Sequence, residues 1–163
     1  MKTTFGCMTI VAFLAFWAHS TDTNMGVHKG LSVTVLEAPR SAKLRVALAN
    51  SSKGPLRVWK DSNSWGAARW RVLILRNGKL QTFFQDPDQD FTVNLPTFSE
   101  IAAGSYLERR LDLNDGTWRS SEGERISLVP GDTAIFIYDV PFTQECPKLG
   151  VWYGVAASST VID

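Results

Sequence analysis

The sequence Arg69-Trp-Arg-Val-Leu-Ile-Leu-Arg-Asn-Gly-Lys-Leu-Gln-Thr-Phe-Phe84 contains the clearest structural signal in the chain, a single Asn77-Gly78 pair between two apolar runs. Asn-Gly accepts the two positive φ angles of a type I′ turn, whose twist matches that of paired antiparallel strands. The stretch therefore predicts a β-hairpin. Leu73 and Leu75 fall on the face that begins with Arg69 and Arg71, so the first strand should be covered on both sides near its end.

The remaining chain contains short runs of alternating apolar and polar residues, separated by Gly, Pro and Asn turns about 8–12 residues apart. Further strands are predicted over 31–37, 43–50, 56–60, 105–113, 125–129, 133–140 and 151–161. Both faces of 133–140 are apolar, so this strand should be central in its sheet. Arg109 falls on the apolar phase of its strand, which predicts an edge position or a salt bridge. The fold class is predicted as all-β, an antiparallel sandwich of about eight or nine strands.

The N-terminus has the layout of a secretory signal peptide over residues 1–20. A basic start is followed by an apolar run from Phe5 to Trp17 and then by Ala18-His19-Ser20, with small residues at positions −3 and −1. The run is shorter than the about 20 residues that a membrane-spanning helix needs. We expect a secreted or extracytoplasmic protein without membrane insertion, a flexible mature N-terminus over 21–30, and a sandwich domain over 31–163. A buried N-terminal helix is the alternative.

Cleavage after Ser20 would leave one cysteine, Cys146, and one histidine, His28. A lone cysteine in an oxidising compartment is either buried and inert or paired with another chain. One histidine in a flexible segment argues against a Ser-His-Asp triad, and one His with one Cys cannot close a zinc site. Cleavage also removes Lys2, so the mature formal charge is zero, which argues against nucleic acid as a partner. No enzymatic activity and no cofactor are predicted.

Three stretches together resemble a known type of domain. They are Leu44-Arg-Val-Ala-Leu-Ala-Asn50 followed by Pro55-Leu-Arg-Val, the loop Asn63-Ser-Trp-Gly66, and Pro130-Gly-Asp-Thr-Ala-Ile-Phe-Ile-Tyr138. Over residues 31–160 the chain resembles secreted immunoglobulin-like β-sandwich domains of a poorly characterised extracytoplasmic type. The antibody pattern of two core cysteines is absent. The resemblance implies a fold and a compartment, and no activity, because sites rather than folds carry function.

Trp65 is the best candidate for an exposed aromatic side chain, because it lies between Ser64 and Gly66 in a polar loop. The alternative is that it plugs one end of the sandwich. Together with Asn63 and Arg69 it forms the predicted ligand-binding site, for an unknown protein or glycan. A rigid, exposed loop here would also suit a protease-inhibitor-like domain.

Two acidic patterns are candidates for sites of chemistry. Asp86, Asp88 and Asp90 have the alternating oxygen spacing of a calcium loop, but Phe91 and Thr97 occupy the positions where an EF-hand needs Gly and Glu. No metal site is predicted, and a calcium-dependent recognition module stays an alternative. A carboxylate-pair hydrolase is a further alternative, for which geometry is the test; its candidates are Glu100, Glu108, Glu122 and Glu124.

Charge is uneven along the chain: residues 29–79 hold eleven basic and two acidic residues, and from residue 86 onward there are thirteen acidic and five basic. We favour pairing of these charges between strands of the two halves. The alternative is a basic face that attracts anionic glycans, made of Lys43, Arg45, Arg57, Arg69 and Arg71. Asn50-Ser-Ser52 is a glycosylation sequon in a permissive turn. The expected function is that of a secreted, non-enzymatic binding domain.

Overall fold

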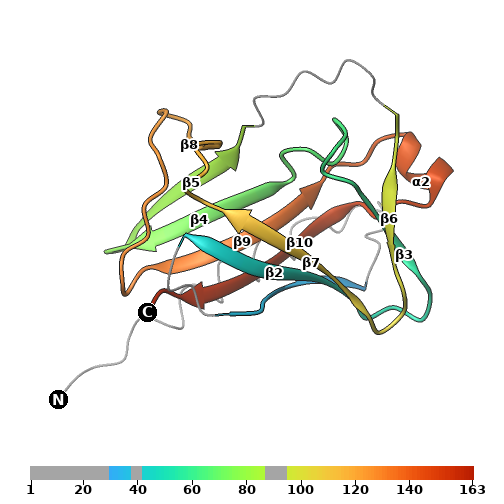
Figure 1. Ribbon diagram of the computed structural model, residues 1–163, viewed down its shortest axis with the longest axis horizontal. Coiled ribbons are helices and arrows are strands. Elements are labelled where there is room, and N and C mark those ends of the chain that lie inside the picture. Colours follow the sequence, from blue (N-terminus) through green and yellow to red (C-terminus); the bar gives the residue numbers. More distant parts are fainter. Residues whose placement is uncertain (1–29, 38–41, 87–94) are drawn as a thin grey trace.

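The computed structural model describes residues 30–37, 42–86 and 95–163. These residues form antiparallel sheets and one short helix, which confirms the all-β prediction (Figure 1). The described part contains ten strands, more than the eight or nine predicted. The predicted signal peptide over 1–20 and nearly all of the predicted flexible segment 21–30 lie outside the described residues.

Two larger sheets and one small sheet build the domain. The three-stranded sheet has the order β1-β2-β7, and its strands are β1 (Leu31–Val35), β2 (Lys43–Asn50) and β7 (Tyr106–Asp112). The five-stranded sheet has the order β10-β9-β4-β5-β8, and its strands are β4 (Trp70–Arg76), β5 (Lys79–Gln85), β8 (Trp118–Ser120), β9 (Thr133–Val140) and β10 (Gly154–Val161). The small sheet pairs β3 (Leu56–Trp59) with β6 (Phe98–Ile101), and the helix is α2 (Glu145–Leu149).

The predicted hairpin is confirmed as β4 and β5. Asn77 has a φ of 49° and Gly78 a φ of 75°, the pair of positive angles that a type I′ turn requires. The pairing places Leu75 opposite Leu80 and Val72 opposite Phe83. The register of this hairpin therefore fixes which side chains of the two strands share a face.

The two larger sheets bury their inner faces in one core. From β2 the core receives Leu44, Val46 and Leu48, and from β4 it receives Val72 and Ile74, all at most 3% exposed. Strand β1 also lies against β10, so the two sheets meet along one edge. Alternation of apolar and polar residues produces this sandwich-like arrangement, because every second side chain of a strand points to the same face.

One end of the sandwich is closed by β3, β6 and α2 (Figure 1). The backbone N–H of Trp152 donates to the Arg57 carbonyl at 2.8 Å and ties the segment after α2 to β3. Cys146 lies in α2 and is fully buried. Of the two alternatives for this cysteine, the structure shows the buried one.

Two strand predictions have opposite outcomes. Strand β9 lies between β10 and β4, so its predicted central position is confirmed. The strand predicted over 125–129 is wrong: Arg125 forms only an isolated bridge with Arg119. The physical reason is that β8 is only three residues long. A tight turn after β8 brings the chain back alongside it for one pairing, and the next residue, Ile126, is already buried in the core.

Candidate functional site

The loop 61–67 is tied to the core by Asn63, a residue of the predicted ligand site. Asn63 is 3% exposed, and its amide nitrogen donates to the carbonyl and hydroxyl oxygens of Thr97 at 2.8 and 3.0 Å. Its side-chain oxygen accepts from the Gly66 backbone N–H at 2.9 Å. A Cβ on Gly66 would lie 2.1 Å from the Lys60 carbonyl oxygen, so this close approach requires glycine. The polar groups of Asn63 are thus used inside the protein.

Of the other two residues of the predicted site, Trp65 lies in the same loop as Asn63, and Arg69 contacts the Trp65 backbone. Trp65 is half-buried and stacks on the buried Trp59, with ring centroids 5.8 Å apart. Arg69 donates to the Trp65 carbonyl at 2.5 Å and to the Ser64 carbonyl at 3.3 Å. These contacts favour the role of Trp65 as a plug of the sandwich end over that of a freely exposed aromatic. A ligand contact at these residues stays a prediction.

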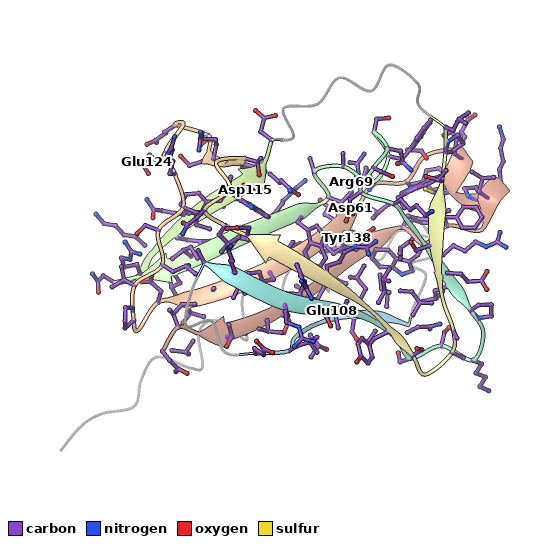
Figure 2. All side chains as sticks on the ribbon, viewed as in Figure 1. Asp61, Arg69, Glu108, Asp115, Glu124 and Tyr138 are labelled. Carbon is purple, nitrogen blue, oxygen red and sulfur yellow. The ribbon has the colours of Figure 1, made fainter. Side chains whose placement is uncertain are left out.

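Asp61 at the start of this loop forms a small polar cluster with Arg109 of β7 and Tyr138 of β9; Figure 2 labels Asp61 and Tyr138. Arg109 pairs with Asp61 at 3.0 Å, which confirms the salt bridge predicted for Arg109. Burial raises the pKa of Asp61, and the nearby Arg109 partly offsets that rise. Burial also raises the pKa of Tyr138 above its ordinary value, so its phenol stays neutral at physiological pH. The ion pair between Asp61 and Arg109 ties the loop to β7.

The basic residues predicted as an alternative glycan-binding face do not form one face. Lys43 and Arg45 lie on β2, Arg57 on β3 and Arg71 on β4, which belong to three different sheets. Their charges are paired: Lys43 with Asp112, Arg45 with Glu37 and Glu108, Arg57 with Glu100, and Arg71 with Asp139, at distances from 2.5 to 3.6 Å. The favoured prediction, pairing of charges between strands, is confirmed.

The hydrolase candidates are distributed over separate elements. Glu100 lies on β6 and Glu108 on β7, each paired with an arginine, and Glu122 and Glu124 lie in the turn after β8. Of the calcium candidates, Asp86 is described and exposed, and Asp88 and Asp90 lie outside the described residues. Among the described residues, no three His, Cys, Asp or Glu side chains are grouped so that they could hold a metal ion.

The expectation that Asn50 lies in a permissive turn for glycosylation is corrected. Asn50 is 2% exposed, and its amide nitrogen donates to the carbonyls of Gly54 at 2.8 Å and Ile101 at 2.9 Å. This nitrogen is the atom that glycosylation would modify. Because its two protons are used in these bonds, the folded domain does not present it.

The most unusual surface is the outer face of the five-stranded sheet, the face turned away from the core. The pairing of β5, β4, β9 and β10 aligns three rows of side chains across this face: Leu80-Leu75-Thr133-Val161, Thr82-Leu73-Ile135-Ser159, and Phe84-Arg71-Ile137-Ala157. We name the apolar members of these rows, together with Val155, the outer apolar face. Its members are Leu73, Leu75, Leu80, Phe84, Ile135, Ile137, Val155, Ala157 and Val161.

Part of the outer apolar face is directly accessible. Leu80 and Val155 are each 52% exposed, Val161 is 55% exposed and Phe84 is 41% exposed. Leu73, Leu75 and Ile137 are half-buried, and Ile135 is 5% exposed. In the sequence, the second apolar phase of 69–76 and 133–140 was the signal for this face. It predicts cover on both sides near the end of 69–76 and a central position for 133–140. The alignment of the rows depends on pairings that the sequence does not specify.

Comparison with models of protein families, with curated proteins and with solved structures finds no match to this chain. Among the described residues, no helix has the length and apolar character needed to cross a membrane.

Proposed function

We propose that this protein is a secreted, non-enzymatic β-sandwich domain that binds a protein partner through the outer apolar face. The observation that carries the proposal is the alignment of apolar side chains across four strands on the side away from the core. The signal-peptide pattern over residues 1–20 supports the secreted part of the proposal, and the resemblance to immunoglobulin-like extracytoplasmic domains supports the same compartment.

An apolar outer face is unusual for an antiparallel sheet. Such sheets commonly bury one face and keep the other polar toward water. Contiguous apolar patches on monomers are rarely larger than a few hundred Å² and mark interaction sites when they are. Burial of such a patch contributes about 25 cal/mol for each Å² removed from water. The face therefore has a thermodynamic reason to be covered.

The chemistry of the face favours a protein partner over a glycan. Eight of the nine members of the outer apolar face are aliphatic, and Phe84 is its one aromatic member. A sugar placed on aliphatic side chains would lose hydrogen bonds to water without replacement, which is costly. An aliphatic protein surface has no such penalty. We therefore propose that the partner presents an apolar protein surface to this face.

The test compares matched variants of the protein purified from its secreted fraction. Leu80→Glu combined with Val161→Glu places two charges on the outer apolar face. Tyr106→Glu is the control, because Tyr106 is 60% exposed on the outer side of the three-stranded sheet. All three substitutions are at exposed positions and should change the free energy of unfolding by no more than about 0.5 kcal/mol each.

Each variant and the wild type is immobilised and exposed to the extracellular fluid of the source, and retained proteins are quantified by mass spectrometry. The wild type and Tyr106→Glu should retain the same partner. The double variant should retain at least about tenfold less, equivalent to about 1.4 kcal/mol. Equal retention by the double variant, with its fold intact by circular dichroism, would contradict the proposal.

Secretion is tested separately by the N-terminus of the purified protein. The proposed signal peptide predicts a mature chain that begins at or near Thr21. Recovery of secreted material that begins at Met1 would contradict this part of the proposal.

A further inference from the structure

At the end of the sandwich opposite α2, a turn places two arginines directly opposite each other. Arg119 on β8 and Arg125 form an isolated antiparallel bridge. Between them the Ser120 N–H donates to the Glu124 carbonyl at 2.9 Å, and the Ser120 hydroxyl accepts from the N–H groups of Glu122 and Glu124. The turn is therefore held closed by its own hydrogen bonds. Like charges directly opposite each other on paired strands are destabilising.

These two arginines differ from most arginines of the domain. Six of the described arginines have a carboxylate oxygen within 4 Å: Arg45, Arg57, Arg71, Arg76, Arg109 and Arg110. Within residues 30–37, 42–86 and 95–163, neither Arg119 nor Arg125 has such a partner. Arg119 donates only to the adjacent Trp118 carbonyl, at 3.2 Å. Their charges are thus not compensated by the described part of the chain.

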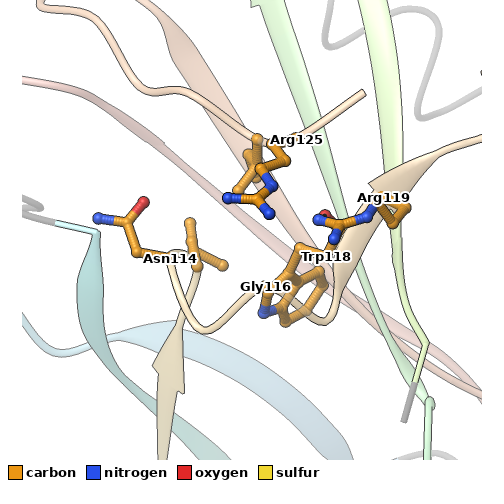
Figure 3. Close-up of a pocket in the computed structure, with 7 residues that line it drawn as sticks. Asn114, Gly116, Trp118, Arg119 and Arg125 are labelled. Atoms are coloured by element: carbon orange, nitrogen blue, oxygen red, sulfur yellow. The ribbon is translucent and has the colours of Figure 1, made fainter. Parts of the chain in front are cut away.

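Both arginines line a pocket (Figure 3). The buried side chains of Leu113, Trp118 and Ile126 form its apolar part, and Asn114 and Gly116 complete the lining. Figure 3 shows Arg119 and Arg125 extending toward the same space beside the Trp118 indole. The Trp118 indole nitrogen is buried and has no hydrogen-bond partner among the described residues. The pocket thus combines two cations with an apolar wall.

Three of the four acidic residues near the pocket have partners of their own. Asp115 accepts from the backbone N–H and hydroxyl of Thr117 at 2.8 and 2.7 Å. Glu124 accepts from Gln81 at 3.2 Å, and Asp112 accepts from the Asn114 N–H at 3.1 Å and pairs with Lys43. Glu122 is exposed in the turn, and none of these four lines the pocket. The lining itself therefore carries positive charge only.

We propose that this pocket binds an oxyanion group, a phosphate, sulfate or carboxylate, between the guanidinium groups of Arg119 and Arg125. Guanidinium groups bind oxyanions through two parallel N–H donors, which gives both charge pairing and direction. The cavity volume of about 200 Å³ decides the size of the ligand. It is several times the volume of a water, about 30 Å³, but below the roughly 300–1,000 Å³ of pockets for drug-sized molecules. The site fits one charged group, and it does not depend on the proposed partner of the outer apolar face.

The experiment is an NMR titration of the ¹⁵N-labelled protein with inorganic phosphate, sulfate and acetate in turn, at constant ionic strength set by chloride. The indole N–H of Trp118 and the side-chain N–H groups of Arg119 and Arg125 should shift and saturate. The control signal is that of Arg110, whose side chain is 86% exposed on another sheet and should not saturate. The anion that saturates at the lowest concentration identifies the group, tetrahedral or planar.

Variants separate a built site from general attraction of anions. Arg119→Gln combined with Arg125→Gln should weaken the affinity at least tenfold, whereas Arg110→Gln should leave it unchanged. Arg125→Lys keeps the charge without the paired donors and should give an intermediate affinity. The proposal is overturned if no anion gives a saturating shift, or if the double variant, with its spectrum still that of a folded protein, binds as the wild type does.

Discussion

The outer faces of the two larger sheets differ in how far their side chains are paired with one another. On the three-stranded sheet, Arg45 of β2 donates to both carboxylate oxygens of Glu108 on β7 at 2.7 Å, and Lys43 lies opposite Asp112. On the five-stranded sheet, the corresponding positions hold the outer apolar face. The charged side chains of the first face pair with one another and with water. The apolar side chains of the second face are more stable when an apolar surface covers them.

The two outer faces of this small domain therefore differ in chemistry: one is charged and internally paired, and the other is apolar. Opposite charges drawn from the two halves of the chain compensate each other across β2 and β7, so that face carries little free charge for a partner. Exposed pairs of this kind contribute little to stability, typically about 0–1 kcal/mol. The apolar side chains of the other face lie outside the core, and we propose that they bind the partner.

The largest expected effect separates the two faces of β4. Ile74 is 1% exposed and points into the core, whereas Leu75 is half-buried on the outer apolar face. Ile74→Ala should lower the free energy of unfolding by about 2–5 kcal/mol, because it leaves a cavity. Leu75→Ala should cost less, about 1 kcal/mol, since part of its area already contacts solvent. Equal losses by chemical denaturation would mean that the outer apolar face belongs to a second core.

A smaller effect is expected in the hairpin turn that aligns the rows of the outer apolar face. Gly78→Val should lower the free energy of unfolding by about 1–2 kcal/mol, because a β-branched residue resists the φ of 75°. Gly54→Val is the matched control, since Gly54 has neither a positive φ nor an atom within 4 Å of an added Cβ. If both variants had the same denaturation midpoint, the turn would not set the register.

The smallest effect concerns pH and the charged face. Hydrogen bonding to Arg45 lowers the pKa of Glu108 below its ordinary value. A carboxyl group with a lowered folded-state pKa contributes stability above its unfolded pKa and loses it as pH falls through the folded pKa. The melting temperature of wild type minus that of Glu108→Gln should therefore be positive at neutral pH and vanish on acidification. A difference that grew with falling pH would contradict the pairing.

Local sequence signals predicted the elements whose cause is local. Asn77-Gly78 predicted the hairpin, and the two apolar phases of 133–140 predicted a central strand. The strand predicted over 125–129 failed because its alternation had no partner: β8 ends at Ser120 and offers only one pairing. Alternation alone does not show whether a partner strand of sufficient length is available, so it does not show whether a strand forms.

The candidate surfaces were harder to predict for the same reason. The sequon at Asn50 predicts an accessible side chain, but its amide nitrogen donates to the carbonyl of Ile101, fifty-one residues away. Leu73 and Ile135 each indicated a second apolar face, and only the β4–β9 register shows that they are neighbours. The pocket depends on Arg119 and Arg125, which no motif distinguished from the other arginines of the chain.

The most direct test of the outer apolar face places a photo-crosslinking amino acid at one of two threonines. Thr82 lies within the rows of the outer apolar face, and Thr34 is its counterpart on the outer side of the three-stranded sheet. After irradiation in the extracellular fluid, the protein labelled at position 82 should form a crosslinked protein product, and the protein labelled at position 34 should form none. A product of twice the mass of the chain would identify a second copy as the partner. Crosslinking only from position 34, or equally from both positions, would contradict the account.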